Sequence, residues 1–122
     1  MEEPKRFVVH RHQKESEPTH WDLMLEREGI LETYRLAEPP EKWGKGAIEA
    51  VKIFDHPLKF LSYEGSVNKG KGRVKIADCG TYRLIKKDEN QQQISFAGKL
   101  FRGEFQICLI KDDRWELKSV SS

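Results

Sequence analysis

The sequence predicts a mainly β protein, a compact antiparallel β-barrel or sandwich with one or two short helical turns. Apolar and polar residues alternate over short stretches, which is typical of strands with one face in a core. Turn-forming Gly, Pro, Asn and Asp residues separate these stretches at close intervals. No long stretch has the apolar period of an amphipathic helix, so we expect antiparallel strands to form nearly all of the structure.

Each expected strand begins and ends near such a turn signal. Residues 27–29 end in Gly29, which tolerates positive φ and predicts a hairpin turn. Residues 47–54 fit either a helix or a strand, and their β-branched side chains favour a strand. Residues 58–63 fit a helical turn or a short strand. The expected strands are residues 6–12, 20–26, 30–36, 47–54, 73–77, 81–86, 93–97, 99–110 and 115–120.

Three segments rich in glycine, proline or polar residues are expected to lack regular structure. Residues 37–46 contain a Pro-Pro pair and two glycines, and residues 65–72 (GSVNKGKG) form a flexible basic loop. Asp78-Cys79-Gly80 has the composition of a turn, and we expect it to separate the strands on either side.

Composition indicates one domain spanning residues 1–122, with residues 1–5 frayed. The net charge of +2 excludes a strong global field, so a nucleic-acid partner must be held by a local basic patch. Cys79 and Cys108 are far apart and form no CxxC motif, which suggests reduced thiols and a cytoplasmic protein. We expect no membrane segment and no secretory signal, since no apolar run is long enough.

The residues His12, His20 and Asp22 form the strongest candidate site. Alternation in the strand 20–26 places His20 and Asp22 on one face, while Trp21 and the leucines occupy the other. Two imidazoles and one carboxylate suit a divalent ion such as Mn²⁺, Zn²⁺ or Co²⁺, and three ligands leave positions open for water and substrate. The alternative is an ordinary polar strand face.

Two further groups of residues suggest contacts with phosphate. In Asp55-His56-Pro57, Asp55 could orient His56 to bind a phosphate oxygen or act as general acid, although the same tripeptide also suits a turn. Lys69 and Lys71 on the glycine loop could follow a nucleic-acid backbone, and Trp43 could stack on a base. Solvated loops are the alternative for both.

Several short motifs occur in one order along the chain and resemble those of the 3′-phosphoesterase domain of bacterial DNA ligase D. The match runs from about residue 6 to residue 120. The motifs are Phe7-Val8-Val9-x-x-His12, His20-x-Asp22-Leu23-x-Leu25-Glu26, Gly29-x-Leu31, Asp55-His56-Pro57-Leu58, Tyr63-Glu64-Gly65, Gly72-x-Val74, Asp78-x-Gly80-Thr81-Tyr82, Gly98-x-Leu100 and Gly103-x-Phe105.

The resemblance implies a β-barrel-like domain that uses a divalent metal, preferably manganese, to remove 3′-terminal ribonucleotides and 3′-phosphates at primer–template ends. By position, His12, His20 and Asp22 match the family's metal ligands. His56 matches the histidine that engages the scissile phosphate, so the resemblance implies that His56, His20 and Asp22 are catalytic. The implied partners are DNA or RNA–DNA 3′ ends and a separate ligase or polymerase, with the protein itself a monomer.

The chain departs from the family pattern at four positions. Met24 stands where the family usually has a phosphate-binding arginine, and Phe60 where it usually has a catalytic tyrosine. The family's polar residue two before the first ligand is His10, and its acidic residue before the Asp-His pair is Phe54. These changes leave the metal ligands in place and remove groups that hold phosphate.

Other residues could replace the lost phosphate contacts. His10 shares a strand face with His12, and Arg11, Arg35 or Lys52 could supply positive charge. Three hypotheses follow: a 3′-phosphoesterase with weakened activity, a metal-containing module that binds nucleic-acid ends or a repair partner without turnover, and the same scaffold acting on another phosphoester.

Overall fold

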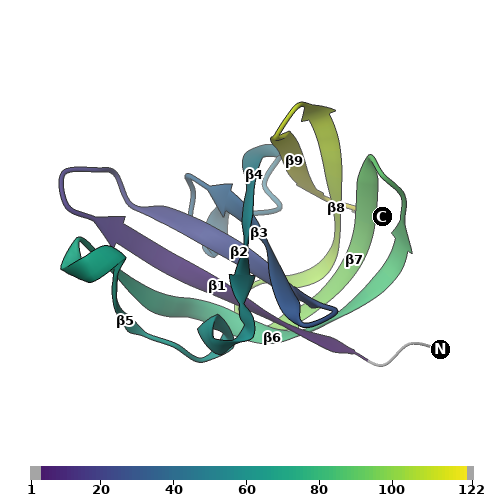
Figure 1. The fold of residues 1–122 in the computed structure, drawn as a ribbon. Coiled ribbons are helices and arrows are strands. Elements are labelled where there is room, and N and C mark those ends of the chain that lie inside the picture. Colours follow the sequence, from purple (N-terminus) through teal and green to yellow (C-terminus); the bar gives the residue numbers. More distant parts are fainter. Residues whose placement is uncertain (1–3, 121–122) are drawn as a thin grey trace.

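The computed structural model describes residues 4–120, which form one antiparallel sheet of nine strands. Neighbouring strands follow the order β1-β2-β3-β4-β9-β8-β7-β6-β5, and β1 also pairs with β6, so the sheet closes into a ring with β5 outside it (Figure 1). The strands are β1 (Lys5–Lys14), β2 (His20–Arg27), β3 (Ile30–Leu36), β4 (Ile48–Pro57), β5 (Gly65–Val67), β6 (Gly72–Lys87), β7 (Gln91–Gly98), β8 (Arg102–Lys111) and β9 (Arg114–Ser119).

This architecture confirms the predicted mainly β, antiparallel fold. Three short 3₁₀ turns occur in the described chain, η1 (Pro40–Lys42), η2 (Leu58–Leu61) and η3 (Asn68–Gly70), where one or two helical turns were expected. β1 begins at Lys5, and Met1–Glu3 of the segment expected to be frayed lie outside the described residues. Residues 4–120 contain no helix with the length and apolarity needed to cross a bilayer.

Two expected boundaries were wrong. Residues 78–80 do not break the chain, because β6 runs unbroken through them while pairing with β1 on one side and β7 on the other. Gly80 does not form a turn but allows β7 to approach β6 closely, since a Cβ there would lie 2.2 Å from the Ala97 carbonyl oxygen. The strand expected at residues 99–110 is β8, and it begins at Arg102 rather than Lys99. The backbone N–H groups of residues 99–101 instead donate hydrogen bonds to the Asp78 carboxylate.

The segments expected to be loops are partly ordered. Residues 65–72 contain β5 and η3, and β5 adds to the free edge of β6. Trp43 is buried in the core and donates its indole N–H to the Glu38 carbonyl, so it neither stacks on a base nor faces solvent. The predicted hairpin is confirmed: a two-residue turn with positive φ at Glu28 and Gly29 joins β2 to β3.

Alternation along β1 and β2 separates two faces of the sheet. One face contributes Phe7, Val9, Leu23 and Leu25 to the main core inside the ring. The opposite face was expected to be polar, but it is buried: Val8, Met24 and Leu31 form a second apolar cluster against which η2 packs. The end of β4, η2 and β5 therefore cover part of this outer face, and the functional candidates lie between them.

Candidate metal centre and phosphate pocket

The antiparallel pairing of β1 with β2 brings the predicted ligands together. His12 lies directly opposite His20 in this register, and Asp22 lies opposite His10. Because side chains alternate along a strand, Asp22 shares its face with His20. This outer face is covered, so His12 is 7% and Asp22 2% exposed. The structure thus brings His12, His20 and Asp22 into one cluster, in which His20 is partly exposed.

The ligand atoms of this cluster converge on one point. The Nε2 atom of His20 lies 2.9 Å from Nδ1 of His12, and each of these nitrogens lies 3.7 Å from Oδ2 of Asp22. Bonds of about 2.0–2.2 Å to one ion place neighbouring ligand atoms roughly 3–3.6 Å apart. The observed separations lie just outside this range, close enough for two imidazoles and one carboxylate to hold a divalent transition metal, and three ligands leave coordination positions open.

Three neighbouring side chains favour the ionised form of Asp22. Burial alone would raise the pKa of Asp22, but the adjacent His12 and His20, and after them the Arg35 guanidinium, hold it well below its usual range. The Arg35 Nε atom lies 3.2 Å from Oδ1 of Asp22, across the β2–β3 pairing. Asp22 therefore presents one oxygen to Arg35 and the other to the two histidines.

His56 faces the same pocket from β4, held by Thr33 and the backbone of Phe54. Its Nδ1 atom lies 3.0 Å from Oγ1 of Thr33 and 3.1 Å from the Phe54 carbonyl oxygen. The Thr33 hydroxyl donates its proton to the Leu31 carbonyl, so both neighbours of Nδ1 act as acceptors. Nδ1 therefore carries the proton in neutral His56, and Nε2 is left with a free lone pair.

This arrangement corrects the expected role of Asp55, since Thr33 and a carbonyl orient the imidazole while Asp55 is exposed. A β-bulge explains it: Phe54 and Asp55 together lie opposite the single residue Glu32. Burial lowers the pKa of His56 despite the opposing influence of Asp22, so the neutral form dominates at pH 7.

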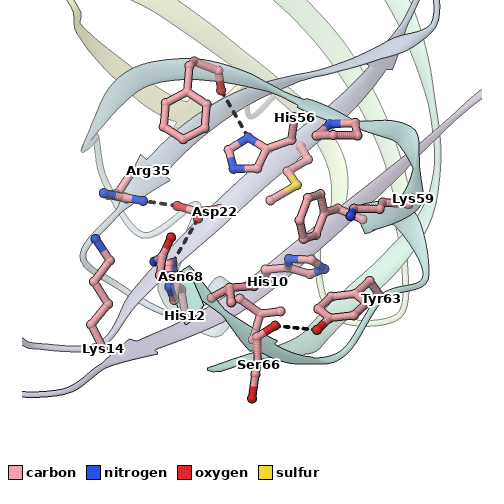
Figure 2. A pocket seen from close by; sticks show the side chains of 16 residues that line it. His10, His12, Lys14, Asp22, Arg35, His56, Lys59, Tyr63, Ser66 and Asn68 are labelled. Atoms are coloured by element: carbon pink, nitrogen blue, oxygen red, sulfur yellow. Dashed lines mark hydrogen bonds and ion pairs between the residues drawn. The ribbon is translucent and has the colours of Figure 1, made fainter. Parts of the chain in front are cut away.

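A cavity of about 530 Å³ joins these groups (Figure 2). Its lining includes His10, His12, Asp22 and His56, whereas His20, the third residue of the candidate metal cluster, is not part of the lining. Positive charge at the pocket comes from Lys14, Arg35 and Lys59. The cavity therefore combines candidate metal ligands, a free imidazole nitrogen and several cationic side chains.

Four of the residues predicted to bind phosphate lie outside this lining. Arg11 is exposed on the opposite face of β1, and Lys52 is half-buried on β4. Lys69 lies in η3, and Lys71 lines a shallower hollow beside the β1–β2 loop. Their predicted contacts with nucleic acid would therefore be made outside the pocket.

Sequence reasoning missed Lys14, Lys59 and Tyr63 as pocket residues, and Thr33 as the residue that holds His56. The position of Lys14 could have been predicted from the sequence pattern, because Lys14 continues the alternation of His10 and His12 along β1. The others depend on the β3–β4 register and on the path of residues 57–66 over the sheet, neither of which has a local sequence signal. The Tyr63 hydroxyl donates to the Ser66 carbonyl and so helps to hold this segment.

The two departures most relevant to catalysis are neighbours in space. Met24 is 1% exposed in the second apolar cluster, and Phe60 packs against the same cluster. The Phe60 ring also meets the rings of His10 and His56 edge-on, with centroids 5.9 and 5.6 Å apart. Both replacements therefore make one wall of the cavity apolar.

His10 lies beneath this wall. It is fully buried, and neither ring nitrogen has a hydrogen-bond partner among the described residues. Burial is the main influence that lowers the pKa of His10, so the ring is neutral at pH 7. A neutral, unpartnered imidazole beside the metal cluster has a free hydrogen-bonding capacity that a ligand in the cavity could use.

Comparisons with known proteins identify the family of this chain. The family model for the DNA ligase D 3′-phosphoesterase domain matches residues 10–109, which confirms the resemblance that the motifs indicated. The multifunctional non-homologous end joining protein LigD of Mycobacterium bovis is 27% identical over 117 residues, covering 89% of this chain and 15% of the relative. Its counterpart from Mycolicibacterium smegmatis is 34% identical over 85 residues, covering 66% of this chain and 11% of the relative.

Proposed function

Because this chain belongs to the family of DNA ligase D 3′-phosphoesterase domains, we propose that it is a metal-dependent phosphoesterase acting on nucleic-acid 3′ ends. The expected substrates carry a 3′-phosphate or a 3′-terminal ribonucleotide. The observation that supports this most directly is the convergence of His12, His20 and Asp22 beside a cavity that also holds His56.

His12, His20 and Asp22 would hold the ion, and Mn²⁺ is the metal we propose, with Zn²⁺ or Co²⁺ as alternatives. When bound, such an ion supplies Lewis-acid stabilisation of charge on the phosphate. The protein contributes a carboxylate that also bonds to Arg35, and two imidazoles kept in place by strand pairing.

His56 would engage the scissile phosphate through Nε2 once that nitrogen has taken up a proton, because its bare lone pair cannot donate to a phosphate oxygen. With Nδ1–H fixed by its two acceptors, Nε2 can accept a proton from an attacking water and can return it to the leaving oxygen. Lys14 and Lys59 line the cavity and would attract the phosphate. They would partly replace the family's phosphate-binding arginine, whose position is occupied by Met24. Loss of one such donor typically lowers the rate about 10²–10³-fold, so we expect weak turnover.

The alternative is a module that binds nucleic-acid ends without turnover. It is favoured by the packing of Met24 and Phe60 into one apolar wall, which leaves no oxyanion donor at either position. In this case metal- and salt-sensitive binding to recessed 3′ ends would occur without product.

The relatives are named as multifunctional end-joining proteins, and the chain spans about 15% of their length or less. We therefore propose that this domain prepares 3′ ends for a ligase and a polymerase, and that it does so as a monomer in the cytoplasm. These partners are expected to act on the same DNA end rather than to bind the pocket itself.

The test is release of inorganic phosphate from a primer–template with a 3′-phosphate, with Mn²⁺ added or removed by EDTA. We expect slow, Mn²⁺-dependent release, lost in Asp22→Asn and kept in Asp113→Asn, which makes the same change on an exposed turn. Mn²⁺ should also raise the melting temperature of the wild type and not that of Asp22→Asn, because a ligand that binds only the folded state stabilises it.

The two hypotheses predict different results in this assay. A melting shift together with end binding but no phosphate release would favour the binding module. Release and melting that are both indifferent to Mn²⁺, Zn²⁺ and Co²⁺ would contradict any metal role for His12, His20 and Asp22.

A further inference from the structure

Phe54 is the most exposed large apolar side chain in residues 4–120, at 74%, and it lines the phosphate pocket. The other large apolar side chains with high exposure, such as Leu100 and Ile110 at 54%, lie away from the cavity lining. An exposed aromatic ring at the edge of a polar, cationic cavity is a feature that folding does not require. Its position suggests a role in ligand contact.

The ring of Phe54 is held in a defined orientation. It stacks on the imidazole of His56, with centroids 4.8 Å apart and an interplanar angle of 17°. The Phe54 carbonyl accepts a hydrogen bond from Nδ1 of the same histidine, which ties ring and backbone to one partner. His56 thus covers one face of the phenyl ring and leaves the other face open, consistent with the high exposure.

The local strand geometry keeps that second face uncovered. β4 pairs with β9 only over residues 48–51, so no strand lies beside β4 on that side at Phe54. The bulge formed by Phe54 and Asp55 opposite Glu32 changes the direction of the side chains at this point. The high exposure of the Phe54 ring therefore coincides with a part of β4 that has no strand paired beside it on that side.

We propose that the open face of Phe54 is a stacking platform for the base of the 3′-terminal nucleotide, so the preferred substrate is a phosphoester of an intact nucleoside. This inference rests on the proposed function, because it assigns the phosphate to His56 and the metal cluster. It makes Phe54 a residue that determines specificity and binding, not a catalytic residue.

The chemistry of the pocket favours a nucleobase over other flat groups. The base would form the third layer of a His56–Phe54–base stack, so the phenyl ring would separate it from the imidazole that engages the phosphate. Lys14 and Lys59 supply positive charge for the attached phosphodiester chain. A phenyl ring offers no hydrogen bond to a base edge, so the platform should accept any of the four bases.

The experiment measures binding by fluorescence anisotropy in EDTA, so that no end is hydrolysed. Two labelled duplexes are compared, with the recessed 3′-phosphate on thymidine or on an abasic tetrahydrofuran residue. Stacking of one base contributes about 1–3 kcal/mol, which corresponds to roughly 5- to 150-fold tighter binding of the thymidine end. Phe54→Ala should abolish this preference, and Phe54→Trp should keep it.

Ile110→Ala is the matched control, because it also removes an exposed apolar side chain but lies outside the cavity. It should leave the preference unchanged. Equal affinity of the wild type for both ends, or a preference that survives Phe54→Ala, would overturn the proposal. These results are independent of turnover, whereas absence of phosphate release from either end in Mn²⁺ would count against the phosphoesterase and not against stacking.

Discussion

At the scale of single residues, the hydrogen bonds around His56 determine which ring nitrogen is free for chemistry. Thr33 is fully buried and accepts from Nδ1, while its own proton goes to the Leu31 carbonyl. Thr33 therefore acts through His56 as a positioning residue. Such indirect partners of an active imidazole commonly affect activity by about 10- to 100-fold.

Thr33→Val removes this acceptor while keeping the shape of the side chain. We expect kcat to fall about 10-fold with little change in KM, because the Phe54 carbonyl alone orients Nδ1 less firmly. Thr33→Ser keeps the hydroxyl and should restore most of the rate. A parallel loss of kcat in both variants, or a changed KM alone, would contradict the positioning role.

The residue scale also shows what the sequence could predict. Alternation was enough to place His20 and Asp22 on one face, because it depends on local periodicity. The pairing of β1 with β2 that brings His12 opposite His20 came from the structure. Arg35, considered from sequence only as a source of charge, lies beside Asp22. Thr33 could not be predicted, because its contact with His56 depends on a bulge in the β3–β4 pairing.

At the scale of elements, the β1–β2 pair is joined at its far end by Arg6 and Glu26. The guanidinium donates from Nε to Oε1 at 3.0 Å and from Nη2 to Oε2 at 2.7 Å. Hydrogen bonds from Arg6 lower the pKa of Glu26 to about 2 from its ordinary 4.5. The pair is partly exposed, so solvent screening keeps its contribution to stability small.

The sign of the pH dependence follows from this lowered pKa. Because the folded state holds Glu26 ionised, its stabilisation is complete above about pH 4.5 and is lost as the pH falls toward about 2. Glu26→Gln should therefore unfold at lower urea than the wild type at pH 7, and the difference should shrink by pH 2.5. Glu89→Gln, on an exposed turn, should show no such pH dependence.

β6 shows why element boundaries were harder to predict than element types. Asp78-Cys79-Gly80 has the composition of a turn, yet β6 continues through it with β1 and β7 on its two sides. Gly80 is needed because the backbone of Ala97 approaches it closely. Asp78 is needed because its carboxylate accepts hydrogen bonds from the backbone of residues 99–101. Both requirements come from strands distant in sequence, so local composition could not reveal them.

At the scale of the whole molecule, closure of the sheet depends on the pairing of β6 with β1. Asp78 reinforces this region from within: its side chain is 3% exposed and accepts four backbone N–H groups. Three of them belong to residues 99–101, between β7 and β8. Phe101, the last of the three, packs into the main core against Phe7 and Trp43.

Asp78→Asn tests how far this one carboxylate stabilises the ring. An amide keeps one acceptor oxygen and points an NH₂ group at N–H donors, so at least two buried donors lose their partner. We expect the free energy of unfolding to fall by roughly 2–4 kcal/mol, measured by urea denaturation. Asp88→Asn makes the same change where a carboxylate oxygen accepts two N–H groups in an exposed turn, and should cost far less. Equal losses in the two variants would show that the buried Asp78 network adds nothing beyond an ordinary turn, and that pairing of β6 with its two neighbours alone closes the ring.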